Sequence, residues 1–192
     1  MGANEQSESS PISGLSREAI VKALQSLSDE LERQGVIGEI CLCGGAVMVL
    51  AFAARVSTKD VDAIFQPAQL VRQLARRIAE EQGLPATWLN DGVKAFVSAR
   101  HETMVGQLPQ FAHLRLTMPV PEYLLAMKCM AARIGSTGGE QSDIPDIVFL
   151  VRHLGLKTAK HVLDVVAQYY PANRIAVKTQ YLVEGLFEEG KI

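Results

Sequence analysis

The sequence predicts an α/β fold in which a mixed β-sheet is flanked by helices and followed by a helical region at the C-terminus. Two observations predict it. Short apolar, β-branched runs with strand periodicity alternate with stretches of helical periodicity as far as residue 120. Beyond Pro121 the apolar spacing is helical to the end of the chain. We therefore divide the chain into a polar tail over 1–14, a core over 15–120 and a helical region over 121–192.

The first helix follows the polar tail. Ser16 is a suitable N-cap and Glu18 suits the positive end of the helix. Gly35 is expected to end this helix. Apolar residues at helical spacing predict a face that packs on the core: Ile20, Leu24, Leu27 and Leu31.

The centre of the chain is a strand over 37–43, two glycines and an apolar run over 46–54. Gly44 and Gly45 let the backbone turn tightly and approach a ligand closely. The run after them is apolar on every side, which predicts a buried helix.

A second strand is expected to begin near Lys59. Residues two apart on a strand point to the same face, so Asp60 and Asp62 should project side by side, while Val61 and Ala63 face the core. Two adjacent carboxylates repel one another and lose hydration. A fold that keeps them together usually provides a cation.

An amphipathic helix over 70–78 follows, closed by Gly83. Its three arginines, Arg72, Arg76 and Arg77, either form a solvated face or contact a phosphate backbone. Short strands are predicted over 84–89, 102–108 and 113–118, and a short helix over 93–97. The first of these strands should end with a packed Trp88.

The helix expected over 122–133 is apolar nearly throughout, and Lys128 is its only charge between Tyr123 and Ala132. A lysine in this position either extends to water or faces a cleft that holds an anion. Taken alone, the pattern favours extension to water. Residues 134–142 are expected to form a glycine-rich loop, and Asp143 and Asp146 then suit the start of another helix.

The bulk properties bound the function. The net charge of −2 offers no global attraction to nucleic acid. No apolar stretch approaches the roughly 20 residues of a membrane span, and the start of the chain lacks a secretory pattern. Cys41 and Cys43 lie two apart on one strand, a poor geometry for a disulfide. We expect reduced, buried cysteines in a cytoplasmic protein.

The order strand, Gly44-Gly45, helix and Asp60-x-Asp62 resembles the nucleotidyltransferase superfamily, which has the fold of DNA polymerase β. Gly44-Gly45-Ala46-x-Met48-x-Leu50-Ala51 and Arg55-x-Ser57-Thr58-x-Asp60-Val61-Asp62-Ala63 are similar to a bacterial subfamily of small nucleotidyltransferases related to the AbiEii-type abortive-infection toxins. The segments 83–91 and 123–128 also resemble that subfamily, so the likeness covers roughly 37–155.

The resemblance implies a site and a chemistry. Asp60 and Asp62 would hold Mg²⁺ or Mn²⁺, and Gly44 and Gly45 would meet the triphosphate of a nucleoside triphosphate. It reverses the interpretation of Lys128, which would meet the nucleotide phosphates. Further residues for the nucleotide are Arg55, Ser57, Thr58 and Arg133. An Arg…Asp-x-x-Asp-Ile element after the lysine is matched by Arg133, Asp143 and Asp146, which adds Asp146 to the catalytic residues.

The sequence departs from the superfamily pattern in two places. Ala46 replaces the usual serine after the glycines, and the strand over 113–118 has no acid to serve as the third carboxylate. Asp91 follows a strand, but it also suits a turn. Asp146 would then compensate for the missing carboxylate.

Three functions remain open. The first is a metal-dependent nucleotidyltransferase that transfers NMP to a hydroxyl of RNA or protein, as the toxin of a toxin–antitoxin pair with an antitoxin partner. The second is a catalytically degenerate protein that binds a nucleotide or a partner. The third is a small-molecule nucleotidyltransferase like those that modify aminoglycosides, for which an acidic cleft would suit a cationic drug.

Overall fold

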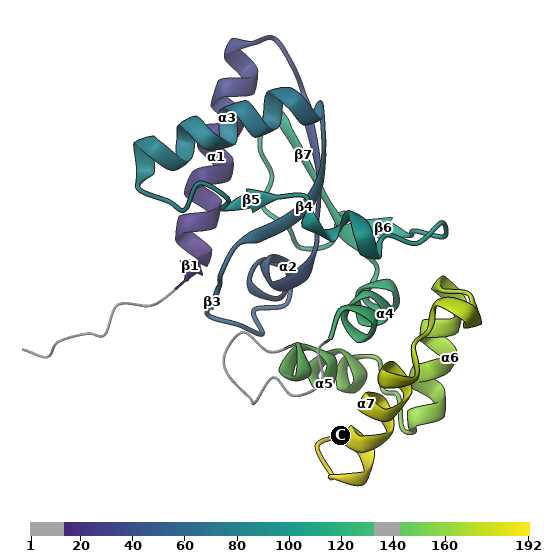
Figure 1. The fold of residues 1–192 in the computed structure, drawn as a ribbon. Coiled ribbons are helices and arrows are strands. Elements are labelled where there is room, and N and C mark those ends of the chain that lie inside the picture. Colours follow the sequence, from purple (N-terminus) through teal and green to yellow (C-terminus); the bar gives the residue numbers. More distant parts are fainter. Residues whose placement is uncertain (1–13, 133–142) are drawn as a thin grey trace, which may run out of the picture.

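The structure, a computed structural model, describes residues 14–132 and 143–192 (Figure 1). It is a mixed α/β fold, which confirms the predicted fold class. The expected tail over 1–14 falls, except for Gly14, outside the described residues.

The main sheet has five strands in the order β5-β4-β2-β7-β6. β2 is antiparallel to β4 and parallel to β7, so the sheet is mixed as predicted. β5 runs parallel to β4 on one side, and β6 runs antiparallel to β7 on the other. The strands are β2 (Gly38–Leu42), β4 (Val61–Gln66), β5 (Leu89–Asn90), β6 (Thr103–Met104) and β7 (Leu114–Pro119).

Several strands differ from their predicted extents. β5 and β6 cover two residues each, where 84–89 and 102–108 were expected, and β4 starts at Val61 rather than near Lys59. A separate two-stranded ladder joins β1 (Leu15–Ser16) to β3 (Ser57–Thr58) and was not predicted. Two residues are too few to show an alternation, so such short strands leave no periodic signal.

Burial alternates along β2, β4 and β7, so one face of the sheet carries the core. Helices α1 (Arg17–Arg33) and α3 (Ala68–Gln82) pack against each other and against this sheet. Ser16 caps α1 by accepting a hydrogen bond from the Ala19 amide at 3.3 Å, as predicted. Gly83 ends α3 with a φ of 65°, a left-handed conformation that glycine adopts without strain.

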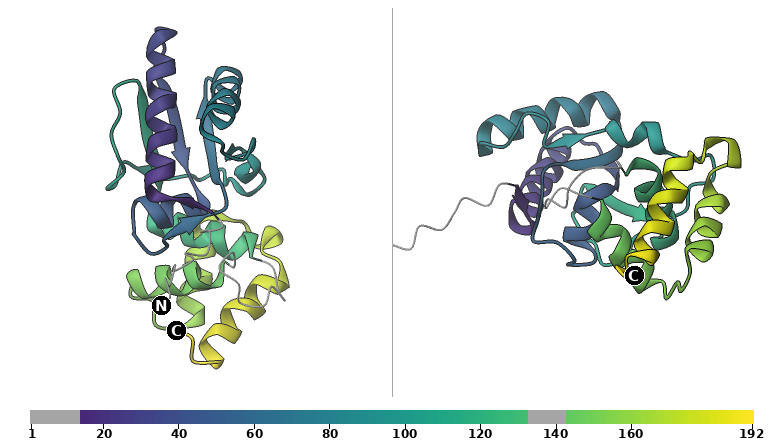
Figure 2. Two further views of the ribbon diagram at one scale, coloured as in Figure 1. Left: turned by 90° about the vertical axis from the view of Figure 1, so that its left-hand side faces the viewer. Right: turned by 60° about the horizontal axis from the view of Figure 1, so that its bottom comes forward.

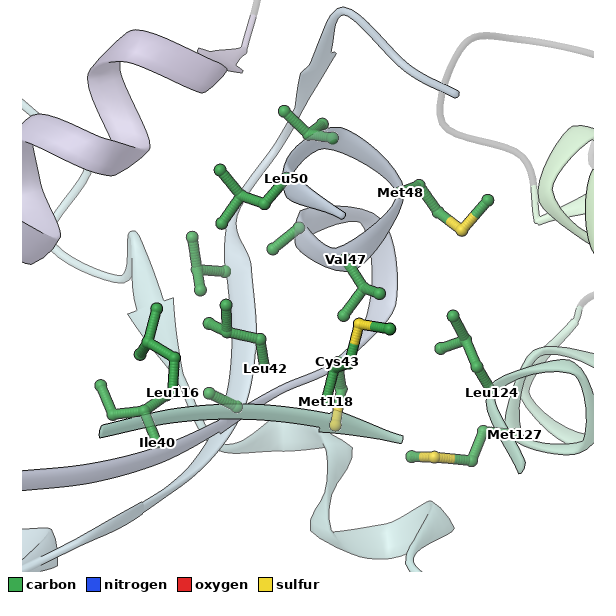
Figure 3. Close-up of a cluster of buried hydrophobic side chains, with 14 of the residues drawn as sticks. Ile40, Leu42, Cys43, Val47, Met48, Leu50, Leu116, Met118, Leu124 and Met127 are labelled. Carbon is green, nitrogen blue, oxygen red and sulfur yellow. The ribbon is translucent and has the colours of Figure 1, made fainter. Parts of the chain in front are cut away.

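The buried helix after the glycines is α2 (Gly44–Leu50), which begins earlier and ends earlier than the predicted 46–54. Its side chains pack on Leu42 and Leu116 of the sheet and face Leu124 and Met127 of the C-terminal region (Figure 3). The apolar run continues past Leu50, but the chain turns there to reach β3. The apolar pattern therefore marked the buried part of this run, over 46–50, but not the end of its helix.

The C-terminal helices gather at one end of the sheet (Figure 1), and the turned views show the same division (Figure 2). Helix α4 contacts β7 and the three helices that follow it, so it joins the sheet to this region. The helices are α4 (Pro121–Ala131), α5 (Ile144–His153), α6 (Ala159–Tyr169) and α7 (Val177–Glu188), and the 3₁₀ turns are η1 (Gly92–Phe96) and η2 (Ala172–Arg174).

Other local expectations are met in part. Trp88 is fully buried and donates from Nε1 to the Ala75 carbonyl at 2.9 Å. The three cysteines are free, and two of them are buried while Cys41 is half-buried. Over 14–132 and 143–192, every helix is too short or too polar to cross a bilayer.

Candidate functional site

Two adjoining cavities lie where the sheet meets helices α4 and α5. The larger, the charged cavity, has a volume of about 480 Å³ and is lined by residues 54–60 with Gly45, Asp62, Lys128, Asp143 and Pro145. The smaller, the apolar cavity, has about 280 Å³. Its lining comes mainly from η1 and α4, and it shares Asp62, Lys128 and Asp143 with the charged cavity.

The two glycines bring the start of α2 close to β4 and β3. Gly44 has a φ of 58°, and a Cβ atom on it would lie 2.8 Å from Asp62 Oδ2. A Cβ atom on Gly45 would lie 2.3 Å from Thr58 Oγ1, closer than real Cβ contacts come. Neither position accepts a side chain without movement of the aspartate or the threonine. The glycines therefore leave the cavity walls free of side chains at these two positions, Gly45 in the charged cavity and Gly44 in the apolar cavity.

Asp60 and Asp62 both line the charged cavity, so the structure brings together the two carboxylates that the spacing placed side by side. Asp62 lies in β4, whereas Asp60 immediately precedes the strand. Both side chains are half-buried. Over the described part of the chain, neither aspartate forms an ion pair with a neighbouring side chain.

Burial raises the pKa of Asp60, and the adjacent charge of Asp62 raises it further. Burial also raises the pKa of Asp62, while a hydrogen bond from Asn90 and the charge of Lys128 act in the opposite direction. In both cases the loss of hydration is the larger cause. The ionised pair is therefore held at a cost to the folded protein.

Asn90 was missed by the sequence analysis. It lies in β5 directly opposite Asp62, and its Oδ1 accepts a hydrogen bond from the Gly92 amide at 2.9 Å. Hydrogen bonding by the Asn90 side chain acts to lower the pKa of Asp62. Asparagine has no sequence signature for such a role, and its pairing with Asp62 depends on the register of β5.

Asp91 does not supply a third carboxylate. Its Oδ2 lies 2.5 Å from Arg72 Nη2 and 2.5 Å from Lys94 Nζ, and it lines neither cavity. These two cations lower the pKa of Asp91 to about 2. The residue opposite Asp62 on the neighbouring strand is the neutral Asn90 rather than an acid.

Lys128 lines both cavities, and its side chain is only 8% exposed. Its Nζ lies 2.7 Å from Asp143 Oδ1 and 2.8 Å from Asp146 Oδ2. Extension to water, which the helix pattern alone favoured, is therefore wrong for this lysine. The partners that hold it lie on α5 and at its N-cap, which the pattern of α4 could not indicate.

Arg55, in the segment between α2 and β3, contacts the same acidic residues, with its Nε 2.5 Å from Asp146 Oδ1. The side chain of Asp146 is only 2% exposed and lies between Arg55 and Lys128. We call Arg55, Lys128, Asp143 and Asp146 the ion cluster. It ties the segment before β3 to α4 and α5 and holds the Lys128 amine at the boundary of the two cavities.

The remaining predicted residues are placed as follows. Ser57 and Thr58 line the charged cavity from β3, where Thr58 is buried against Gly45. Lys59, exposed at the same cavity, was not among the predicted site residues. Arg133 lies outside the described residues.

The residues present fit a magnesium ion that is coordinated partly by the protein and partly by the phosphates of a bound nucleotide. Over 14–132 and 143–192 there is no group of three or more His, Cys, Asp or Glu residues able to cage a metal. Mg²⁺, however, is commonly held by one or two carboxylates together with substrate phosphates. Asp60 and Asp62 are two half-buried carboxylates with raised pKa values, and a divalent cation would relieve both costs.

The chain was compared with family models, with curated proteins and with solved structures, and none of them matches it.

Proposed function

We propose that the protein is a metal-dependent nucleotidyltransferase that moves NMP from a nucleoside triphosphate to a hydroxyl group. The observation that carries the proposal is the pair Asp60 and Asp62, which lines a charged cavity without an ion-pair partner among the described residues. Structural carboxylates are usually paired or exposed, whereas functional sites retain a costly arrangement. The glycine wall beside the pair supports the same function.

In this proposal each residue has a separate task. Asp60 and Asp62 hold the divalent ion, which neutralises phosphate charge and orients the reacting groups when it is bound. Gly45, at the charged cavity, lets the triphosphate approach the backbone, and Gly44 leaves room beside Asp62 at the boundary with the apolar cavity. Lys128 and Lys59 face the phosphates, with Ser57 and Thr58 at the same wall.

The ion cluster positions the lysine. Asp143 and Asp146 fix the Lys128 amine from two sides, and Arg55 holds Asp146 in place. A fixed cation stabilises charge that develops on the transferred phosphoryl group without having to reorganise during the reaction. Asp146 thus acts through Lys128 rather than on the nucleotide itself.

A catalytically degenerate nucleotide-binding protein is the second candidate, because Asn90 occupies the position where a third carboxylate would adjoin Asp62. The aminoglycoside alternative receives less support. The described lining of the charged cavity has three acids, Asp60, Asp62 and Asp143, and three bases, Arg55, Lys59 and Lys128, so it offers no excess of acid to a cationic drug. A toxin role with an antitoxin partner, RNA or protein as the acceptor, and a cytoplasmic location stay predictions.

The test is transfer of labelled nucleotide by the purified protein, with each of the four nucleoside triphosphates, Mg²⁺ or Mn²⁺, and cellular RNA and protein as acceptors. Asp60→Asn and Asp62→Asn should each reduce transfer more than about 100-fold, beyond the loss typical of an outer-shell partner. Asp164→Asn, in an exposed pair with Lys160, is the matched control and should retain activity. Wild-type protein that binds nucleotide with metal but transfers none would favour the degenerate candidate.

A further inference from the structure

The apolar cavity has a composition unlike that of its neighbour. Beyond the shared Asp62, Lys128 and Asp143, its lining is Gly44 and Gly92 with apolar side chains, and it excludes the loop over 54–60. The apolar side chains are Val93 and Phe96 from η1 and Leu124, Met127 and Ala131 from α4. A mainly apolar hollow with a few convergent polar groups is typical of a small-molecule subsite.

We propose that the apolar cavity is the acceptor subsite of the transfer reaction and takes an uncharged aromatic group that carries a hydroxyl. This inference rests on the proposed function. A transfer reaction needs two substrates that meet at the reacting atoms, and here two cavities meet at Asp62, Lys128 and Asp143. The charged cavity has the volume and the charges for a whole nucleotide, which leaves the smaller cavity for the second substrate.

The charges around the apolar cavity select against ionic acceptors. Lys128 is the one cation in its described lining, and Asp143 and Asp146 already hold it. The nearby Lys94 and Arg72 are both bound to Asp91. A phosphate backbone would find no unpaired cation among these residues, and a polycation would have to bury charge against apolar side chains. A neutral aromatic ring needs no unpaired cation and buries no charge, so it avoids both problems.

Aromatic character follows from the contacts available. Phe96 and Met127 are half-buried and buried side chains in the wall of the cavity, and both make favourable contacts with a ring. A ring seated between η1 and α4 would leave its hydroxyl at the boundary where Asp62 lies. The cavity volume of about 280 Å³ suits one ring system rather than an extended ligand.

The transfer step balances without a further reactant. The acceptor oxygen forms a bond to the α-phosphorus, and the bond from that phosphorus to the oxygen bridging the α- and β-phosphates breaks. The hydroxyl proton passes to water, and pyrophosphate leaves through the charged cavity. The product is a phosphodiester of the aromatic acceptor.

The first experiment needs no nucleotide. Saturation-transfer NMR is recorded with N-acetyltyrosinamide and with uridine as neutral hydroxyl-bearing probes, on wild-type protein and on Phe96→Ala. The variant should weaken binding of the effective probe about 10-fold, as expected from losing most of one buried aromatic contact. Phe111→Ala, a partly buried phenylalanine that lines neither cavity, is the matched control and should bind as the wild type does.

The second experiment measures transfer and nucleotide binding on the same proteins. Phe96→Ala should raise the KM for the acceptor about 10-fold, while nucleotide affinity in the presence of Ca²⁺ changes less than about 2-fold. Label on N-acetyltyrosinamide, whose ring carries the hydroxyl, would support the inference. Label on uridine alone would assign a ribose hydroxyl as the acceptor and would overturn it.

Two further results would overturn the inference. If Phe96→Ala weakens nucleotide binding as strongly as acceptor binding, the apolar cavity holds the base of the donor. If neither neutral probe binds, but an RNA oligonucleotide binds with steep salt dependence, the acceptor is recognised through phosphates elsewhere. Failure of the proposed function would appear differently, as an absence of nucleotide binding with any metal, which the first experiment does not depend on.

Discussion

Two pairs of aspartates lie near the charged cavity, and they differ in what surrounds them. Asp143 and Asp146 contact Lys128, and Asp146 also contacts Arg55. Asp60 and Asp62 adjoin each other, and no ion pair with a described residue accompanies them. A carboxylate that is buried with its cations belongs to the framework of the fold. One that is buried without them marks a place where a cation can be supplied from outside.

The largest expected effect comes from breaking the ion cluster. Asp146→Ala leaves Arg55 without its buried carboxylate partner and Lys128 with one partner fewer, so unfolding free energy should fall by about 3–5 kcal/mol. The measurement is urea denaturation at neutral pH. Asp164→Ala, which breaks an exposed pair on α6, should cost only about 0.3–0.5 kcal/mol. Equal losses from the two variants would contradict the structural role of the cluster.

A second substitution sharpens the contrast by adding charge to the unpaired site. Asn90→Asp removes the hydrogen bond to Asp62 and puts a third carboxylate beside it, so the metal-free protein should lose about 1–3 kcal/mol at neutral pH. The same change adds a hard oxygen ligand, and Mn²⁺ should bind more tightly. Calorimetric titration measures the affinity for Mn²⁺, and denaturation in EDTA measures the stability of the metal-free protein. Asn90→Ala separates the two effects, since it loses the hydrogen bond to Asp62 without adding a carboxylate ligand for the metal.

A smaller effect is expected when the repulsion in the unpaired site is removed. Because the folded-state pKa of Asp62 is raised, its ionisation costs stability above that pKa, and the cost disappears as the pH falls below the unfolded value. Asp62→Asn should therefore be as stable as wild type or slightly more stable at pH 7. Thermal melting from pH 7 to pH 4 should show the two proteins converging. A variant that melts far below wild type at every pH would make Asp62 a structural residue.

The smallest effect concerns an exposed carboxylate with partners. The pKa of Asp91 is lowered to about 2 by Lys94 and Arg72, so its stabilisation is present above the ordinary value and is lost as the pH falls through the folded value. Asp91→Asn should lower the melting temperature slightly at pH 7, and by progressively less as the pH falls toward 2. Raising the salt concentration should shrink the difference, because exposed ion pairs are screened.

Local patterns carried most of the site that could be predicted. The glycines 44 and 45 and the spacing of Asp60 and Asp62 are each short-range features. The structure places Gly45, Asp60 and Asp62 at the charged cavity and Gly44 at the adjoining apolar cavity, beside Asp62. The helical caps at Ser16 and Gly83 were predictable for the same reason. A turn, a cap or a two-residue alternation is specified by neighbours in sequence.

The features that escaped prediction depend on tertiary contacts. Arg55 and Asp146 are 91 positions apart in the chain, and nothing near either residue indicates the other. Asn90 gains its role only through the register of β5 with β4. The helix pattern alone favoured extension of Lys128 to water, and only the resemblance placed it in the cleft, because its acidic partners lie beyond the helix that carries it. The apolar cavity likewise forms only when η1 packs near α4.

The most direct test of the central claim is the melting temperature of wild type, Asp60→Asn and Asp62→Asn, each with and without Mn²⁺ and a non-hydrolysable nucleoside triphosphate. A ligand at about 100 times its Kd adds roughly 2.7 kcal/mol, which for a chain of this length raises Tm by about 5–10 °C. We predict this rise for wild type and little or none for either variant. An equal rise in the variants, or no rise in wild type with any nucleotide, would contradict the claim that Asp60 and Asp62 hold the cation.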